Sequence, residues 1–241
     1  MGADERVIWV TGAGSGMGRA AALAAARTGR AVALSGRRVD PLQEVAAAIR
    51  ADGGRAIVVP GDTTDPAWAR SAVATISDEL GRIDELVLAA GANTPARRWD
   101  DQAMDAFDTV VETNLLGTAR LVDAALPALR ARGGTVVVVS SYAGWTFSAG
   151  AGVAYSASKS ALASLCRTLN AQEAEHGVRA THLCPGDVDT DFLAQRPVVP
   201  DAAARAVMLQ PDDVARSILH VLDAPAHVRI DELVISPLSQ H

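Results

Sequence analysis

The sequence predicts a doubly wound α/β fold with a seven-stranded parallel sheet flanked by helices on both faces. Short β-branched runs alternate with alanine-rich helical stretches along the whole chain, and this alternation favours a parallel sheet. Runs such as VVVVS and ELVLA are continuously apolar, which is typical of strands covered on both faces. With 241 residues, 49% of them hydrophobic, the chain is long enough to bury a sizeable core.

The predicted elements follow one another in regular order. Strands are expected at residues 7–11, 31–35, 56–60, 86–89, 135–140, 178–183 and 233–235. Helices are expected at residues 16–28, 41–52, 66–80, 102–131, 152–176 and 211–223. In residues 190–210 the apolar residues follow neither the period of a helix nor that of a strand, and the segment is rich in alanine and proline. Long irregular segments of this kind predict a lid over a site. Because no linker or repeat interrupts the pattern, we expect one domain over residues 1–241.

Composition narrows the classes of partner and compartment. The net charge is −6, with no basic block and no acidic tail, so neither nucleic acid nor a membrane is an expected partner. The start MGADERVIWV lacks a cleavage site of small residues, and no apolar run approaches the roughly 20 residues that span a bilayer. Cys166 and Cys184 have no metal-ligand spacing. A reduced, cytoplasmic location is expected.

A glycine-rich turn joins the first predicted strand to the first helix, in the segment TGAGSGMGRA. Glycine lets backbone approach a ligand without a Cβ in the way. The helix that follows would direct free N–H groups and its positive dipole end at a pyrophosphate. An ordinary tight turn is the alternative, but the position between strand and helix favours phosphate binding. The candidate cofactor contacts here are Gly12, Gly14, Ser15, Gly16, Met17 and Gly18.

The residues after the second strand bear on the choice of cofactor. An acidic residue at this distance from the glycines binds the ribose of NAD, whereas arginine accommodates the 2′-phosphate of NADP. Gly36 stands where the acid is expected, and Arg37 and Arg38 follow. Two guanidiniums suit a dianionic phosphate, which favours NADP(H) over NAD(H), although a solvated charge pair is the alternative. Asp62, beside Thr63, is a candidate acceptor for the adenine amino group or a helix N-terminal acid.

Tyr155 and Lys159 are spaced four residues apart in a stretch of helical composition. This spacing puts both side chains on one helix face. A free tyrosine has a pKa of about 10, and a neighbouring ammonium lowers that pKa toward the range useful for general acid–base catalysis. Lys159 is the only lysine beside 21 arginines. Chance accounts for one lysine in such a composition, but its place one turn from one of only two tyrosines argues for a catalytic pair.

The fifth predicted strand ends at two serines in VVVVSSYAG, Ser140 and Ser141. Ligands of open α/β sheets bind beyond the carboxyl ends of strands, where a hydroxyl can hydrogen-bond a substrate carbonyl. Serine is also a common turn residue, so the serines alone carry little weight.

Taken together and in order, these motifs resemble the short-chain dehydrogenase/reductase family over nearly the whole chain. The segment TGAGSGMG matches the family's TGxxxGxG, and Tyr155 and Lys159 match its YxxxK. The other matches are the family's serine at Ser141, the NxxG asparagine at Asn114 in TNLLG, and PGxVxT at Pro185, Gly186, Val188 and Thr190.

The resemblance implies a Rossmann fold and an oxidoreductase that moves hydride between NADP(H) and a carbonyl compound or secondary alcohol, such as a ketone or hydroxy acid. In the family, the residue matching Tyr155 exchanges a proton with the substrate oxygen, and the one matching Ser141 holds that oxygen. Lys159 would lower the pKa of Tyr155 and bond the nicotinamide ribose. Asn114 would position a water that links Lys159 to solvent.

The resemblance also implies contacts of Val188 and Thr190 with the carboxamide side of the nicotinamide. It implies a homotetramer or homodimer packed through the helices near residues 102–131 and 152–176. A non-catalytic NADP(H)-binding redox sensor is the alternative function, and the intact Asn114, Ser141, Tyr155 and Lys159 argue against it. A dehydratase or epimerase is disfavoured because those relatives carry an added substrate domain.

Two departures from the family pattern stand out. The family's NNAG reads LAAG, with Leu88 and Ala89 in place of the asparagines, while Ala90 and Gly91 remain. The family's asparagine side chains therefore cannot support the central sheet, whereas the backbone approach to the cofactor is expected to survive. The separation between Ser141 and Tyr155 is one residue longer than usual, which leaves the choice between Ser140 and Ser141 open.

Substrate contacts are predicted only in outline. Aromatic residues near the site suggest an apolar cavity, namely Tyr142, Trp145, Phe147 and Phe192. In the lid, Arg196 or Arg205 would pair with a carboxylate or point to solvent. The run Arg97, Arg98 and Trp99 is interpreted as a solvated loop rather than a substrate contact, and no histidine shows metal-ligand spacing.

Overall fold

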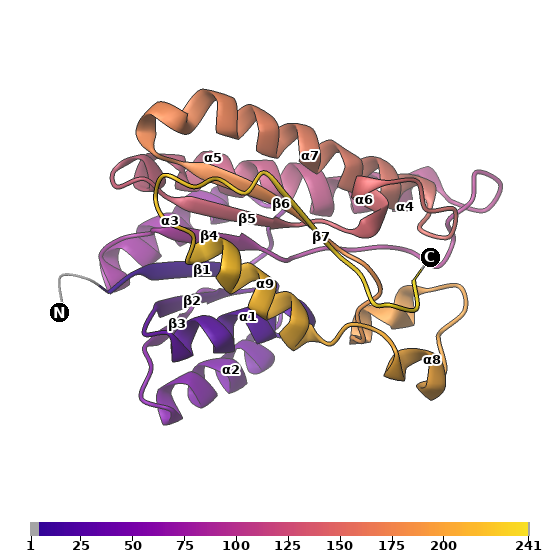
Figure 1. Ribbon diagram of the computed structural model, residues 1–241, viewed down its shortest axis with the longest axis horizontal. Helices are drawn as coiled ribbons and strands as arrows, with labels where there is room; N and C mark the ends of the chain where they lie inside the picture. The colour runs from indigo at the N-terminus through magenta and orange to yellow at the C-terminus, as the bar shows by residue number, and fades with distance from the viewer. Residues whose placement is uncertain (1–4, 241) are drawn as a thin grey trace.

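The computed structural model describes residues 5–240 and contains one sheet of seven parallel strands (Figure 1). Their order is β3-β2-β1-β4-β5-β6-β7. The bounds are β1 Val7–Thr11, β2 Ala31–Ser35, β3 Ala56–Val58, β4 Glu85–Leu88, β5 Thr135–Val139, β6 Arg179–Pro185 and β7 Glu232–Ile235. All seven predicted strands are confirmed, with shifts of one or two residues at some ends. The strand order reverses direction at β1, so that β1 and β4 flank the switch point of a doubly wound fold.

Helices cover both faces of the sheet, as predicted (Figure 1). One face packs against α1 (Gly16–Arg27), α2 (Val39–Ala51) and α9 (Pro211–Leu222). The other face packs against α3 (Pro66–Leu80), α5 (Gly117–Arg130) and α7 (Val153–Glu173). Alternate residues of each strand feed the two cores: Ile8 and Val10 enter one, and Val7 and Trp9 the other. This two-sided burial explains why the strands are continuously apolar.

The helix predicted over residues 102–131 is interrupted. The structure has α4 (Met104–Val111), a π-helical turn at Glu112–Leu116, and then α5. A π-turn inserts one extra residue and is often found at functional sites. Asn114 lies in this turn with its side chain fully buried. The spacing of apolar residues in the sequence does not reveal this extra residue, because the helices before and after the π-turn each keep a buried face of their own.

The predicted lid contains short helices and is held at both ends. It includes a 3₁₀ turn at Asp191–Gln195 and the helix α8 (Ala202–Ala206). Val188 and Leu209 form a parallel bridge, in which Leu209 N donates to Asp187 O at 2.9 Å and Asp189 N to Leu209 O at 2.8 Å. The two ends of the segment are therefore joined next to the carboxyl end of β6.

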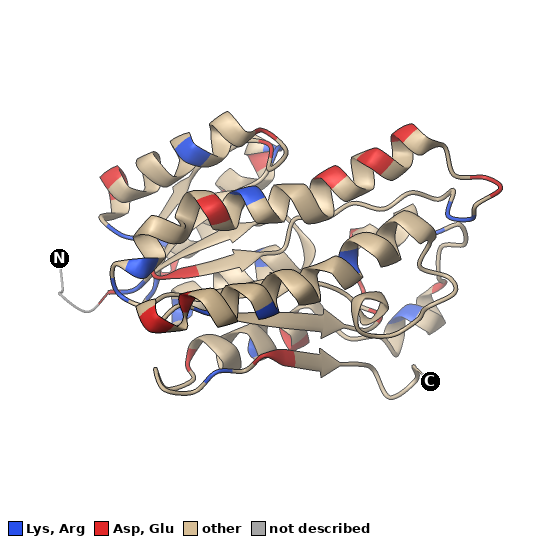
Figure 2. Ribbon diagram, turned by 90° about the horizontal axis from the view of Figure 1, so that it is seen from above, with Lys and Arg blue, Asp and Glu red and all other residues tan. Residues whose placement is uncertain are grey.

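Charged residues of both signs are interspersed along the elements in Figure 2. Within residues 5–240, none of the helices has the length and apolar character needed to cross a membrane.

A buried ion cluster joins the opposite, amino-terminal edge of the sheet. Arg30, at 3% exposure, precedes β2 and donates to Glu85 of β4 through Nε at 2.6 Å and Nη2 at 3.1 Å. Its Nη2 also contacts Asp223 after α9 at 2.7 Å, and Arg6 donates to Glu85 at 2.9 Å. Burial raises the pKa of Glu85, even though both arginines lower it. Glu85 therefore depends on these partners to remain charged.

Replacing Arg30 by methionine leaves Glu85 buried without its main partner. We expect Arg30→Met to lower the free energy of unfolding by about 3–5 kcal/mol, measured by urea denaturation. Adding Glu85→Leu should recover most of this loss, because the uncompensated charge is then removed. The control Arg98→Gln removes an exposed pair with Asp100 and should leave the denaturation midpoint unchanged, because solvent screens that pair. A loss below about 1 kcal/mol for Arg30→Met would contradict the role assigned to the cluster.

Candidate active site

A cavity of about 1100 Å³ opens at the carboxyl ends of the strands. It extends from the glycine-rich turn after β1 to Tyr155 on α7. Of the predicted site residues, the following line it: Gly12, Gly14, Ser15, Gly16, Met17, Gly18, Arg37, Arg38, Asp62, Thr63, Ala90, Gly91, Ser141, Tyr155, Lys159, Pro185, Gly186, Val188 and Thr190. Asn114 is fully buried behind this surface. The structure therefore brings together residues that lie far apart in the sequence.

The glycine-rich turn has a geometry that only glycine permits. A Cβ on Gly18 would lie 2.3 Å from the carbonyl oxygen of Gly12, and Gly12 has a φ of +65°. Helix α1 begins at Gly16 after Ser15, without a side-chain cap and without an acid in its first turn. Its first N–H groups and its positive dipole end are therefore available to an anion. This turn fits the pyrophosphate of a dinucleotide.

Two free guanidiniums lie at the far end of the cavity. Arg37 and Arg38 are exposed and form no salt bridge within residues 5–240, although the charge of Arg37 contributes to lowering the pKa of Asp62. Asp62 accepts from Thr64 N at 2.9 Å and Thr64 Oγ1 at 2.8 Å, and these bonds lower its pKa. The helix N-terminal acid is Asp65, whose side chain accepts from Ala67 N. Asp62 lines the cavity and precedes the helix. The alternative that it is the N-terminal acid of α3 is therefore wrong.

Tyr155 and Lys159 lie one turn apart on α7, as predicted, with Lys159 Nζ 5.7 Å from the centre of the Tyr155 ring. Lys159 is 4% exposed, and its Nζ donates to the carbonyl oxygen of Val139 at 2.9 Å. Burial lowers the pKa of Lys159 to about 8. Lys159 thus anchors α7 to the end of β5.

Burial raises the pKa of Tyr155, and three neighbours oppose that rise. They are the Ser141 hydroxyl and the cations Arg97 and Arg196. Lys159 is not among the groups that act on the pKa of Tyr155 in this structure, and its expected effect on the phenol stays a prediction. The positive charges that act on the phenol come from two loops, and the ammonium of Lys159 is directed at Val139 O instead.

The two serines after β5 have separate roles. Ser140 is buried and donates to the carbonyl oxygen of Lys159 at 3.1 Å, which supports α7. Ser141 is the N-cap of the short helix α6 (Tyr142–Trp145), and its Oγ accepts from Ala143 N at 3.2 Å. Since Ser141 is also the serine beside the Tyr155 hydroxyl, the choice that the spacing left open falls on Ser141.

Asn114 connects the loop after β4 to the helix that carries Tyr155. Its Oδ1 accepts from Ala92 N at 2.8 Å, and its Nδ2 donates to Ala92 O at 3.0 Å and Ser158 Oγ at 3.1 Å. Ser158 in turn donates to the carbonyl oxygen of Tyr155 at 2.8 Å. A Cβ on Gly91 would meet Asn114 Oδ1 at 3.4 Å and Lys159 Nζ at 3.6 Å, so polar atoms converge there.

The LAAG segment is supported from β1. Thr11 Oγ1 accepts from Ala89 N at 3.2 Å and Ala90 N at 3.3 Å. A Cβ on Gly12 would lie 2.9 Å from the backbone of Ala89, so the two turns are in close contact. The N–H groups of Ala89 and Ala90 are therefore bound by a threonine hydroxyl, and Ala90 and Gly91 line the cavity.

The prediction of a solvated loop is wrong for Arg97 and right for its neighbours. Arg97 is half-buried and lines the cavity, with its guanidinium bound to three backbone carbonyls. Arg98 pairs with Asp100 at the surface, and Trp99 is 81% exposed. The sequence places all three in one run, and only tertiary contacts separate them.

The lid arginines already have partners within the chain. Arg196 pairs with Asp187, and Arg205 pairs with Asp189 at 2.6 Å. Sequence reasoning also missed Gln240 at the carboxyl end of the chain. Its Oε1 accepts from Asp187 N at 2.8 Å, and the residue lines the cavity. No spacing in the sequence signals this contact, because the tail reaches Asp187 only once β7 is in the sheet.

The aromatic residues expected near the substrate divide between cavity and surface. Tyr142, Phe147 and Phe192 line the cavity, whereas Trp145 does not and packs edge-on against Tyr142 at 5.3 Å between ring centres. Phe192 lies 6.1 Å from Tyr155 between ring centres. The cavity wall next to the phenol is therefore partly apolar.

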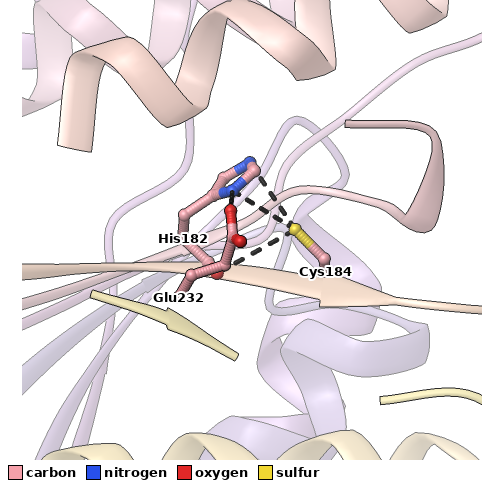
Figure 3. Close-up of side chains that lie close together, drawn as sticks. All are labelled: His182, Cys184 and Glu232. Carbon is pink, nitrogen blue, oxygen red and sulfur yellow. Dashed lines mark hydrogen bonds and ion pairs between the residues drawn. The ribbon is translucent and has the colours of Figure 1, made fainter. Parts of the chain in front are cut away.

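A second polar cluster lies between β6 and β7, outside this cavity (Figure 3). His182 and Glu232 are paired in register, with Nδ1 and Oε2 3.0 Å apart, and Cys184 Sγ lies 3.3 Å from the same nitrogen. Burial raises the pKa of Cys184 to about 12, which keeps the thiol protonated, whereas metals bind the thiolate. Hydrogen bonds account for the arrangement of these three side chains. That the protein has no metal site stays a prediction.

The chain matches the family model described as short chain dehydrogenase over residues 6–198. It is 36% identical to the glycine betaine reductase of Emericella nidulans over 96% of this chain, yet it spans only 19% of that protein's length. It is 31% identical to an uncharacterised oxidoreductase of Staphylococcus aureus (strain MW2), over 97% of this chain and 98% of the relative.

Solved structures agree with this match. An alcohol dehydrogenase from the archaeon Thermococcus sibiricus, in complex with 5-hydroxy-NADP, superposes with a TM-score of 0.89 at 29% identity, covering 99% of both chains. A serine dehydrogenase in complex with NADP⁺ gives a TM-score of 0.89 at 28% identity, covering 98% of this chain and 96% of that one. The family match extends over most of the chain, and the site described above contains the residues expected of it. The chain belongs to the short-chain dehydrogenase/reductase family of oxidoreductases, which bind a nicotinamide cofactor.

Proposed function

We propose that the protein is an NADP(H)-dependent enzyme that interconverts a carbonyl compound and a secondary alcohol. One observation carries this proposal: a single cavity joins the glycine-rich turn and two free arginines to a buried tyrosine. The turn fits a pyrophosphate, Arg37 and Arg38 fit a 2′-phosphate, and Tyr155 is placed to exchange a proton with a substrate oxygen. Two similar solved structures were determined with NADP-type cofactors.

The proposed chemistry divides between the cofactor and the chain. When bound, NADP(H) supplies or accepts the hydride at the substrate carbon. Tyr155 then gives its proton to the carbonyl oxygen during reduction, or takes the proton of the hydroxyl during oxidation. The Ser141 hydroxyl holds the same oxygen, as a donor to the negative charge that develops there. Arg97 and Arg196 stabilise the phenolate that proton transfer leaves on Tyr155.

The other predicted residues position this pair. We propose that Lys159 bonds the nicotinamide ribose while it stays tied to Val139 O, so that α7 and the cofactor share one anchor. Asn114 holds the Ala92 loop and Ser158 in place and positions the water that links Lys159 to solvent. Pro185, Gly186, Val188 and Thr190 line the nicotinamide side of the cavity. A cytoplasmic location and a homotetramer or homodimer stay predictions.

A redox sensor that binds NADP(H) without turnover is the second candidate. The intact set of Asn114, Ser141, Tyr155 and Lys159 disfavours it, since a sensor has no need of a proton donor. Turnover of any carbonyl compound by the protein decides between the two functions.

The assignment of the 2′-phosphate is tested by titrating NADPH and NADH and following cofactor fluorescence. We expect the double variant Arg37→Ala/Arg38→Ala to weaken NADPH binding at least tenfold, because two charge-assisted contacts to phosphate are lost. NADH binding should change by less than about twofold. Arg27→Ala, at the far end of α1, is the control. Equal binding of both cofactors, unaffected by the double change, would assign NAD(H) instead. Binding of neither would remove the basis of the oxidoreductase proposal.

The role of Tyr155 is tested by Tyr155→Phe, which removes only the hydroxyl. We expect the rate of carbonyl reduction to fall by about 10²–10⁴-fold, because the general acid is lost. The Kd for NADPH should stay within about threefold of the wild-type value, which shows that the cavity is intact. A variant that keeps most of its activity would rule out Tyr155 as the proton donor.

The buried state of Lys159 can be observed directly, because it is the only lysine in the chain. Protein labelled with ¹³C-lysine should give one side-chain NMR signal, which reports a pKa of about 8 when the protein is folded and of 10.5 when it is unfolded in urea. Between these values the unfolded chain binds more protons, so the free energy of unfolding should rise with pH relative to Lys159→Met. If the pKa of Lys159 in the folded protein equals its pKa in urea, the ammonium is solvated and the predicted burial is contradicted.

A further inference from the structure

Arg97 is a half-buried cation at the reacting end of the cavity. It lies in the loop between β4 and α4 and lines the cavity together with Tyr155. Its guanidinium donates to the carbonyl oxygens of Thr94 at 2.8 Å, Gly150 at 2.9 Å and Gln195 at 2.8 Å. These acceptors are neutral, and no carboxylate within residues 5–240 forms a salt bridge with Arg97. Within the part of the chain that the structure describes, the positive charge of Arg97 therefore has no counter-ion.

The guanidinium also keeps unused hydrogen-bond donors. Arginine has five N–H groups, and the three bonds to the backbone use one on each nitrogen. One N–H on each terminal nitrogen is left. Two N–H groups of one guanidinium are the donors that hold a carboxylate in a bidentate pair.

A second cation reinforces the positive charge at this place. Arg196 follows the 3₁₀ turn of the lid and lines the same cavity. Arg97 and Arg196 both act on the charge of Tyr155, and Arg196 adds to burial in lowering the pKa of Arg97. Asp187 offsets the charge of Arg196. The charge that remains unbalanced is that of Arg97, and a partly buried cation of this kind is costly until an anion binds.

The fold makes specific room for this side chain. Gly152, the residue before α7, has a φ of +95°, and a Cβ there would lie 2.9–3.3 Å from Cβ, Cγ and Cδ of Arg97. Val153 N donates to the carbonyl oxygen of Arg97 at 3.2 Å, so the loop is tied to the helix that carries Tyr155. The positive end of the α7 dipole does not stabilise a cation at this place. Packing therefore holds Arg97 where electrostatics within the chain does not favour it.

We propose that Arg97, assisted by Arg196, binds a carboxylate of the substrate, so that the enzyme acts on oxo acids and hydroxy acids in preference to neutral ketones and alcohols. This inference rests on the proposed function and deepens it. The reacting oxygen lies at Tyr155 and Ser141, and the substrate carboxylate supplies the counter-ion that Arg97 lacks. The pairing also places a negative charge near the phenol only while substrate is bound.

The test compares each acid with its neutral isostere. The probes are pyruvate, acetoacetate and levulinate with their amides, so that three spacings between carbonyl and carboxylate are covered. For each pair, kcat/KM is measured with the cofactor that the protein binds, and the ratio of acid to amide is the readout. A purely structural role of Arg97 would lower both rates together and leave this ratio unchanged.

We expect wild-type protein to prefer at least one acid over its amide by tenfold or more. Arg97→Gln should lower that ratio at least tenfold, because the loss of charge near the phenol affects acid and amide alike whereas only the acid loses its carboxylate contact, and Arg97→Lys should retain part of the ratio. The control Arg98→Gln, one residue away and exposed, should leave the ratio unchanged.

A wild-type ratio near one at all three spacings overturns the proposal, whether or not the variants fold. Equal losses for acid and amide in Arg97→Gln overturn it too, because the role is then structural. If neutral ketones are reduced and none of the acids is preferred, this inference fails while the proposed function stands. If no carbonyl compound is reduced although the cofactor binds, the proposed function fails with it.

Discussion

The parallel arrangement of the strands brings all of their carboxyl ends to one edge of the sheet, and each part of the site is attached to that edge. The glycine-rich turn follows β1, Arg37 and Arg38 follow β2, and Ser141 follows β5. Segments far apart in the sequence thus share one cavity without long connecting loops. The opposite edge, which carries no part of this cavity, is tied together by the buried pairing of Arg30 and Glu85.

Helix α7 is held to this edge by polar contacts as well as by apolar packing. Lys159 Nζ binds the last carbonyl of β5, Ser140 binds the backbone of Lys159, and Ser158 receives a bond from Asn114. Each contact involves a buried group, and an unpaired group in such a place would be costly. The same contacts that satisfy these groups also set the position of Tyr155 relative to the cavity. Stability and catalytic geometry therefore depend on shared residues.

The charges around Tyr155 are unevenly balanced. Burial opposes ionisation of the phenol, while Arg97 and Arg196 favour it from two different loops. Lys159 is closest in sequence, but its ammonium is turned to a backbone carbonyl and its own pKa is lowered by burial. The positive charge that acts on the phenol of Tyr155 thus comes from the segment 190–210 and from the loop after β4.

Local patterns in the sequence determined the seven strands, the glycine-rich turn, and the pairing of Tyr155 with Lys159. Each of these follows from periodicity or spacing within a short segment, which a sequence displays directly. Only the tertiary structure decided the π-turn at Asn114, the separation of Arg97 from Arg98, and the return of Gln240 to the cavity. These features arise from contacts between distant segments, which have no local signature. The physical reason is that burial and charge pairing depend on which segments meet, and that is settled when the sheet assembles.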